Sequence, residues 1–259
     1  MVIRAIRSHV ATHDWFAVSI DVLIVVVGVF LGTQANNWNA DRIAARDART
    51  HRERLIEDVD SNQIDFAGRK AYYESVRVHA LAALAEFGQP TPQSDEALVV
   101  DAYQASQINA RLLRRSTYEE LVSEGALSTL GSPALRDIAE AFYQGLRVLD
   151  DNNDRLPPYR DRVRRELPYP VVSAIRRQCG DRVREHRGAL ISSLPPTCRL
   201  DLDPTIVRRA AMQLREAPGI ERDLSQYIVD LDVRLGNFAG SDRRANTFRN
   251  ALRQADAPS

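Results

Sequence analysis

The stretch between the two tryptophans of the chain, Trp15 and Trp38, constrains the fold more than any other part of the sequence. From Trp15 to Thr33 it consists mainly of Val, Ile, Leu and Phe, with one acidic residue, Asp21, and no basic residue. A helix needs about 20 mostly apolar residues to cross the roughly 30 Å hydrocarbon core of a bilayer. On such a helix the two indole rings would lie about 34 Å apart, which suits opposite membrane interfaces. The sequence therefore predicts a transmembrane anchor over residues 15–38.

Two features inside this anchor bear on contacts between helices. Asp21 lies about 9 Å past Trp15 along a helix, where a carboxylate costs less than at the bilayer centre. It is either a polar contact to a partner helix or an acid near the boundary that water reaches. Gly28 and Gly32 form a G-x-x-x-G spacing, which lets two helices approach closely but also occurs by chance in apolar sequence. This spacing favours a homodimer formed through the span.

A cleaved signal peptide is the alternative interpretation of the same stretch. Val22–Gly32 has the length of the apolar region of a signal peptide, and Thr33-x-Ala35 offers a small-residue cleavage site. Against this, the polar region before it is long, and Asp21 adjoins the apolar run. We therefore favour an anchor that is not cleaved.

Two blocks of the sequence resemble a family of uncharacterised bacterial single-span membrane proteins, known only as a domain of unknown function. In the first block, IDVLIVVVGVFLGTQANNWNADR, Asp21, Gly28, Gln34 and residues 36–39 match the family's acid, LVVIGVLIALQ-like run and N-N-W-N signature. The second block, Ser116–Tyr143, is similar to the family's T-Y-x-x-L-x-S-x-G-x-L segment and the helix that follows it.

The resemblance covers roughly a fifth of the chain. Gly32 and Thr33 depart from it, because the family usually has bulkier apolar residues at these positions. The resemblance implies an uncleaved anchor in a bacterial inner membrane, and it implies no activity.

Composition narrows the classes of function. The chain has 35 basic and 35 acidic residues and a formal net charge of +0, which argues against a general nucleic-acid binder, since such proteins need a basic excess or stripe. The sequence contains no P-loop, dinucleotide-binding, zinc-protease or nucleophile-elbow motif. We therefore expect no catalytic, cofactor-binding or metal-binding residues and no cofactor. A catalytic site assembled from scattered residues stays open, because such sites are defined by geometry.

The cysteines bear on the side of the membrane that the domain occupies. Cys179 and Cys198 are the only two in the chain, and in an exported domain such a pair is normally oxidised to a disulfide. Basic residues lie on both sides of the anchor, so their distribution does not decide the orientation. The cysteine pair and the basic head usual in the family favour a periplasmic C-terminal domain.

We divide the chain into a polar head (1–14), the anchor (15–38), a long juxtamembrane helix (39–87) and a helical domain (88–259). In the juxtamembrane helix, apolar residues repeat every seven positions, while the companion positions are half polar. The first set is Val59, Phe66, Tyr73, Ala80 and Phe87, and the second is Asn62, Arg69, Val76 and Ala83. A coiled coil needs both sets to be apolar, so we favour a single stripe packed on a helical bundle.

The helical domain reads as a series of capped amphipathic helices. After a break at 88–96, we expect a helix over 95–114 capped by Ser94. Ser116 with Glu119 has the pattern of a capping box, and Ser132-Pro133 has the pattern of a cap followed by a first-turn proline.

We expect apolar stripes to face the core in this domain. Those that define the helices are Leu135, Ile138, Phe142, Leu146 and Leu149; Ile206, Ala210 and Leu214; and Ile220, Leu224, Tyr227, Ile228, Leu231, Leu235 and Phe238. Ser241 is expected to cap a last helix that carries Phe248 and Leu252. We find no alternating run long enough for a sheet.

Residues 154–204 are the least regular part, with seven prolines and both cysteines. From Arg155 to Arg187 there are ten arginines against four acidic residues, which makes this the one locally basic stretch. The arginines either contact anionic lipid headgroups or an acidic partner, or they form solvated helix faces.

Together these features predict an all-α protein with a transmembrane helix that continues into a long helix and a multi-helix bundle. We expect it to act through protein contacts, as a scaffold, sensor or accessory subunit, with the lipid bilayer, a second copy and an unknown protein as partners and no nucleic acid. The alternative is a membrane-anchored hydrolase or lipid-modifying enzyme with its site in 154–204.

Overall fold

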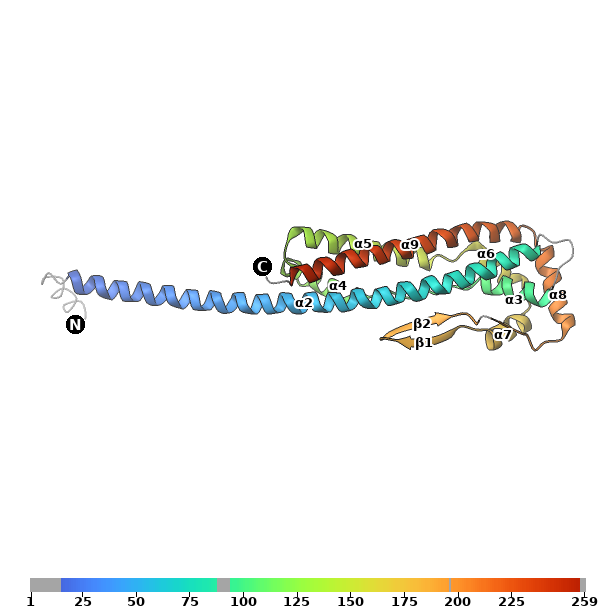
Figure 1. Cartoon of the computed structure of the whole chain (residues 1–259), viewed down its shortest axis with the longest axis horizontal. Helices are drawn as coiled ribbons and strands as arrows, with labels where there is room; N and C mark the ends of the chain where they lie inside the picture. Colours follow the sequence, from blue (N-terminus) through green and yellow to red (C-terminus); the bar gives the residue numbers. More distant parts are fainter. Residues whose placement is uncertain (1–14, 88–93, 196, 257–259) are drawn as a thin grey trace, which may run out of the picture. The chain divides into compact units, whose positions relative to one another are not determined.

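The computed structural model describes residues 15–87, 94–195 and 197–256, except for the side chains of residues 16, 17, 153 and 154. The expected polar head at 1–14 lies outside the described residues, as does most of the expected break at 88–96. The chain divides into two compact units, Met1–His51 and Arg52–Ser259, which we describe separately. The elements are α2 (Trp15–Phe87), α3 (Asp95–Ala105), α4 (Ser116–Ser123), η1 (Ala126–Leu130), α5 (Pro133–Asp154), α6 (Pro158–Glu166), α7 (Tyr169–Gln178), β1 (Arg182–His186), β2 (Ala189–Ser193), α8 (Pro204–Glu216) and α9 (Ile220–Ala255). The predicted all-α class is confirmed, and the predicted continuation of the apolar stretch into one long helix corresponds to α2 (Figure 1).

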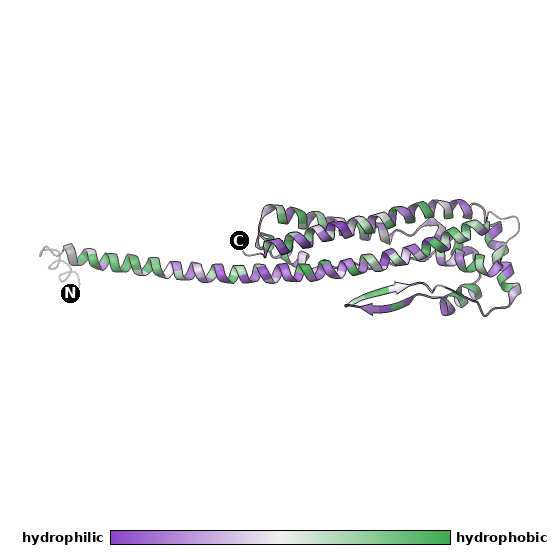
Figure 2. Cartoon of the chain, viewed as in Figure 1, coloured by the Kyte–Doolittle hydropathy of each residue, from purple (hydrophilic) through white to green (hydrophobic). Residues whose placement is uncertain are grey.

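The first unit contains the N-terminal part of α2. Among the described helices, α2 is the one that is long and apolar enough to cross a membrane. Figure 2 shows an almost continuous run of hydrophobic residues in this part of α2. None of the apolar window is buried within the chain, so these side chains have no partner among the described residues of the protein.

The second unit is built on the remainder of α2, which pairs with α9 in antiparallel fashion. The order of the contacts shows the direction, because higher numbers on α2 meet lower numbers on α9. The pairs are Arg52–Asp256, Asp60–Arg249, Tyr73–Phe238 and Arg77–Asp232. The boundary between the two units falls inside α2, between residues 51 and 52.

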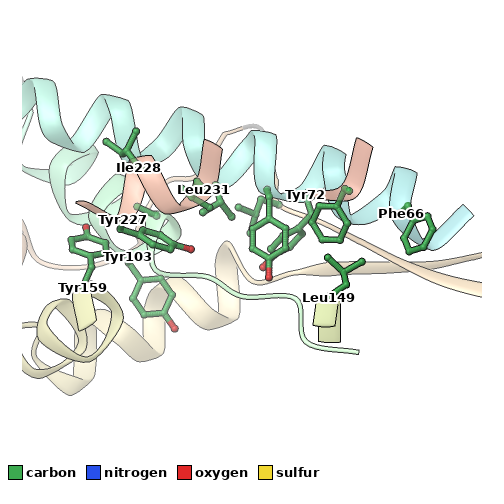
Figure 3. Close-up of a cluster of buried hydrophobic side chains, with 14 of the residues drawn as sticks. Phe66, Tyr72, Tyr103, Leu149, Tyr159, Tyr227, Ile228 and Leu231 are labelled. Carbon is green, nitrogen blue, oxygen red and sulfur yellow. The ribbon is translucent and has the colours of Figure 1, made fainter. Parts of the chain in front are cut away.

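α5 covers α9 and completes a core that is rich in aromatic residues. Ser132 caps α5 by accepting a hydrogen bond from the Leu135 amide, as predicted, and Pro133 occupies its first turn. At one end of the core, Tyr143 stacks on Tyr118, with ring centroids 4.2 Å apart, and packs edge-on against Phe248. Nearer the other end, Figure 3 shows Tyr72, Tyr103, Tyr159 and Tyr227 grouped with aliphatic side chains of α9.

The expected helix over 95–114 is wrong in its second half. Ser94 caps α3 as predicted, with its side chain accepting from the Ala97 amide, but the helix ends at Ala105. Residues 106–115, the irregular segment, run along α2 without regular structure. Side chains of α2 form hydrogen bonds with the backbone of this segment. Asn62 donates to and accepts from the Arg114 backbone at 2.9 and 2.8 Å, Arg69 donates to the Arg111 carbonyl at 2.6 Å, and the Tyr73 hydroxyl accepts from the Asn109 amide at 3.1 Å.

These bonds explain the polar residues in the heptad pattern of α2. Asn62 and Arg69 are each only 1% exposed, like the apolar residues of the neighbouring stripe. Both sets of positions are therefore buried, and the polar ones provide partners for backbone groups that would otherwise be unsatisfied. The pattern packs inside this chain's own bundle, as we favoured, but through both sets of positions rather than through a single stripe.

The expected capping box at Ser116 is also wrong. α4 begins at Ser116, but its N-cap position is Arg115, and no side chain within the helix caps it. The carboxylate of Asp58 on α2 accepts a hydrogen bond from the Thr117 amide at 3.3 Å instead. Oε1 of Glu119 lies 3.5 Å from Nε of Arg115, so the Glu119 carboxylate forms an ion pair instead of completing a capping box.

The expectation that the chain contains no sheet is wrong for residues 182–193. β1 and β2 form an antiparallel hairpin in which Arg182 faces Ser193 and His186 faces Ala189. Its two-residue turn, Arg187-Gly188, has positive φ at both positions, as a type I′ turn requires. β1 is exposed along its whole length, so it shows no alternation of apolar residues that the sequence could reveal.

Ser241 does not cap a separate last helix. α9 runs without a break from Ile220 to Ala255, and Ser241 is buried within it. The side chains expected to face the core, including Phe248 and Leu252, do so.

Replacing Asn62 by Leu tests whether α2 holds the irregular segment in place. The substitution leaves the Arg114 amide and carbonyl without their partner, and we expect it to lower the free energy of unfolding by about 1–3 kcal/mol. Denaturant unfolding of the full chain in detergent measures the change. Val78→Ala on an exposed face of the same helix is the control and should change stability by less than about 0.5 kcal/mol. Equal stability of the two variants would show that Asn62 does not support this segment.

Candidate functional site

A polar cavity of about 510 Å³ lies where α3, α6 and α7 meet in the second unit. We call it the arginine pocket. Its lining residues are Tyr103, Gln107, Arg160, Arg164, Arg176, Gly180 and Asp181. Most of them fall inside the irregular region 154–204, where the sequence is locally basic.

Helix packing brings the three arginines to this cavity. Arg160 and Arg164 are one turn apart on α6, so they share a face of that helix. The other face of α6 is held in the core by Tyr159, which is fully buried and donates a hydrogen bond to the Ala102 carbonyl at 2.9 Å. Arg176 lies in the last turn of α7, whose buried side is formed by Val171, Ala174 and Ile175.

The end of α3 orients the two arginines of α6. Arg160 donates to the Ser106 carbonyl, and Nε of Arg164 donates to the Ser106 hydroxyl at 3.2 Å. Arg164 also donates to Oε1 of Gln107 at 3.1 Å and lies over the ring of Tyr103, 4.6 Å from its centroid. Both guanidiniums are therefore positioned before any ligand arrives.

The hydrogen-bond partners of Arg160 and Arg164 are neutral groups, which sets these two arginines apart from others in the domain. Arg115, Arg162, Arg215 and Arg249 each form an ion pair with an aspartate from another element. Within the described part of the chain, none of the three pocket arginines forms such a pair. Burial and the nearby charge of Arg164 lower the pKa of Arg160, as expected for two neighbouring cations on one helix face.

Asp181 is the one acidic residue in the lining. Its carboxylate accepts a hydrogen bond from the hydroxyl of Tyr72, with oxygen–oxygen distances of 3.1 and 3.2 Å. Asp181 is exposed overall, but partial burial of its carboxylate raises its pKa, while the Tyr72 bond and the charges of Arg111, Arg160 and Arg164 oppose that rise. Three arginines and one aspartate thus line the pocket, which gives its lining an excess of positive charge.

The disulfide and a glycine hold the wall that carries Asp181. Cys179 and Cys198 are joined in a disulfide with Cα atoms 5.5 Å apart, and Gln104 donates to the Cys179 carbonyl at 2.7 Å. At Gly180 a Cβ atom would lie 2.5 Å from the carbonyl oxygen of Arg176. Only glycine lets the chain turn this closely past the end of α7.

The anchor residues singled out from the sequence all lie in the first unit and do not form part of this pocket. Trp15 and Trp38 are 71% and 64% exposed, and Asp21 is exposed as well. No atom outside the helix's own backbone lies within 4 Å of a Cβ built at Gly28 or Gly32, so both positions are open. Arg42 lies over the ring of Trp38, 5.0 Å from its centroid.

Sequence reasoning located the basic stretch but did not name the pocket residues. The spacing of Arg160 and Arg164 was a usable signal, because residues four apart share a helix face. The contributions of Tyr103, Gln107 and Asp181 had no signal in the sequence, since the end of α3 and the segment after α7 are brought together only by tertiary packing.

The arrangement is suited to binding an anion. Guanidinium groups donate several hydrogen bonds in a fixed plane and match carboxylate or phosphate oxygens. The lining contains no serine, cysteine or histidine that could act as a nucleophile. Among the described residues, no group of three or more His, Cys, Asp or Glu side chains is arranged to hold a metal ion.

Replacing Gly180 by Ala should disturb the pocket wall. The new Cβ would collide with the Arg176 carbonyl, and we expect a loss of about 1–3 kcal/mol in stability, as for overpacking elsewhere. Thermal unfolding of the full chain measures it. Gly236→Ala on the exposed side of α9, where a Cβ meets nothing within 4 Å, is the control and should be neutral or slightly stabilising. An unchanged melting temperature for Gly180→Ala would show that the wall adjusts freely.

The chain matches none of the protein-family models, curated proteins or solved structures with which it was compared. The apolar helix and the geometry of the arginine pocket are therefore the features of the chain that bear on its function.

Proposed function

We propose that this chain is a membrane-tethered binding protein. Residues 15–38 anchor it in a bilayer, and the helical domain binds a small anion in the arginine pocket. The observation that carries the proposal is that three arginines line one cavity and form no ion pair among the described residues. An anion placed among them would offset both their charge and the repulsion between Arg160 and Arg164.

The proposal includes a bacterial inner-membrane location with a single span and a periplasmic domain. The exposed apolar side chains of α2 support the span, since contact with lipid would cover them. The disulfide supports the periplasm, because such bonds persist in oxidising compartments. The resemblance of the anchor and the N-N-W-N block to bacterial single-span proteins agrees with both.

The protein would act through contacts, as a sensor, scaffold or accessory subunit. Its partners would be the bilayer, a second copy and another protein that responds to pocket occupancy. Gly28 and Gly32 support the second copy, because their open positions let another helix approach closely. Nucleic acid is not among the partners, because the overall charge is balanced.

A second candidate function is favoured by the position of the pocket. A membrane-anchored hydrolase or lipid-modifying enzyme would need a polar cavity in residues 154–204, and the arginine pocket lies there with a carboxylate beside its guanidiniums. Asp181 would be the general acid or base of such an enzyme. Turnover of a bound ligand by the wild-type chain, lost in Asp181→Asn, would favour this function over binding alone.

The tether is tested by fusing alkaline phosphatase or green fluorescent protein to Ser259. We expect an active phosphatase and a dark fluorescent protein, with the chain retained in membranes after carbonate extraction. A variant with Val25→Arg and Val26→Arg should be lost from the membrane fraction, because each charge costs about 2.5–3.5 kcal/mol near the bilayer centre. A soluble mature chain that begins near Asn36 would contradict the tether.

The pocket is tested by anion-dependent thermal stability of the full chain in detergent. Ligand that binds only the folded protein raises the melting temperature, so phosphate, sulfate and citrate should stabilise the wild type. Arg176→Ala should lose most of this gain. Arg177→Ala is the matched control, because Arg177 adjoins Arg176 on α7 but donates to Ser173 and does not line the pocket. Equal stabilisation of wild type and Arg176→Ala by every anion would contradict binding in the arginine pocket.

A further inference from the structure

We infer that the ligand of the arginine pocket is a phosphomonoester of a small hydroxylated molecule, such as a sugar phosphate or a polyol phosphate. This inference rests on the proposed binding function and names the chemical class of the ligand. It follows from the charge of the pocket, the directions of its donors, its size and the position of Asp181.

The charge of the pocket fits a phosphomonoester better than a carboxylate. Three arginines and one aspartate line the pocket, and a phosphomonoester carries about −1.5 to −2 at neutral pH, against −1 for a single carboxylate. The phosphate would lie beside Arg160 and Arg164, because both line the cavity from one face of α6 and neither forms an ion pair among the described residues.

The donors approach from two helices, which also favours phosphate. Arg160 and Arg164 come from α6 and Arg176 comes from α7. A carboxylate is planar and is satisfied by one guanidinium fork, whereas a phosphomonoester has three terminal oxygens that point in different directions. Ser106 and Gln107 hold two of the guanidiniums in place, so little ordering remains to be done when the ligand binds.

The cavity is larger than an inorganic anion needs. Its volume of about 510 Å³ lies in the range of pockets that hold small organic ligands. The phosphate would occupy only the arginine side, and the remaining space would hold the organic part of the ester.

Asp181 selects the chemistry of that organic part. An ionised carboxylate only accepts hydrogen bonds, so it repels phosphate and needs a donor from the ligand. The amide of Gln107 is already used, because it accepts from Arg164 and donates to Gln104. Asp181 accepts one bond from Tyr72 and has further lone pairs, which a ligand hydroxyl can use.

Titration calorimetry on the full chain in detergent tests the inference. The probes are glycerol 3-phosphate, glucose 6-phosphate, inorganic phosphate, glucose 6-sulfate and citrate. We expect the two phosphomonoesters to bind at least about tenfold more tightly than the other three. Arg176→Ala should weaken their binding by about tenfold or more, as expected for loss of a charged hydrogen bond, while Arg177→Ala should leave it unchanged.

Asp181→Asn tests the role of the rim carboxylate. Removing its charge should strengthen the binding of inorganic phosphate and reduce the preference for the hydroxylated esters. Arg176 and Asp181 are both exposed at the surface, so their variants should fold, and circular dichroism with thermal unfolding checks this.

The outcomes separate this inference from the proposed function. Binding of citrate or glucose 6-sulfate as tight as that of the esters, with the same dependence on Arg176, would overturn the phosphomonoester and keep the anion pocket. Absence of binding by all five probes would overturn both. A short-chain lysophosphatidate identifies the source: tighter binding than glycerol 3-phosphate assigns the ester to a lipid headgroup, and equal or weaker binding assigns it to a water-soluble molecule.

Discussion

The end of α3 at Ala105 determines how the elements of the domain meet. If the helix continued, the Ser106 carbonyl would accept a hydrogen bond from the backbone, and its hydroxyl would face the next helical turn. Because the helix stops, the carbonyl and the hydroxyl of Ser106 are available to Arg160 and Arg164 of α6. The chain then runs along α2 without regular structure, which leaves room for α6 and α7 to form the arginine pocket.

This arrangement is stable only because α2 supplies polar groups from within its buried face. A buried backbone amide or carbonyl without a partner costs about 1–3 kcal/mol, so an irregular segment inside a bundle needs side-chain partners. Asn62, Arg69 and Tyr73 provide them at intervals of seven and four residues along one helix. The polar positions of the heptad pattern thus supply hydrogen-bond partners for the backbone of the irregular segment.

Features that depend on neighbouring residues could be predicted from the sequence. The apolar helix, the long helix that follows it, the stripes of α5 and α9 and the caps at Ser94 and Ser132 all depend on local spacing or on a single side chain.

Features that depend on distant residues could not be predicted. α3 ends where residues of α2 offer better partners than the helix does, and α4 is capped by Asp58, far away in the sequence. The hairpin was missed because β1 is exposed and its Arg187-Gly188 turn lacks the usual asparagine or aspartate. The arginine pocket was missed because its residues are far apart in the sequence and meet only in the folded domain.

Net charge is a poor guide to such a site, and the balance of this chain shows why. The 35 basic and 35 acidic residues cancel overall, which argues against binding a long polyanion, because that needs a continuous basic surface. A pocket needs only a local excess, and that excess arises where arginines are held by neutral groups instead of carboxylates. Arg162 lies between Arg160 and Arg164 in the sequence, yet it faces away and pairs with Asp223, so its charge is already compensated. The direction in which each arginine leaves α6 therefore decides whether it stabilises the fold or remains free to bind an anion.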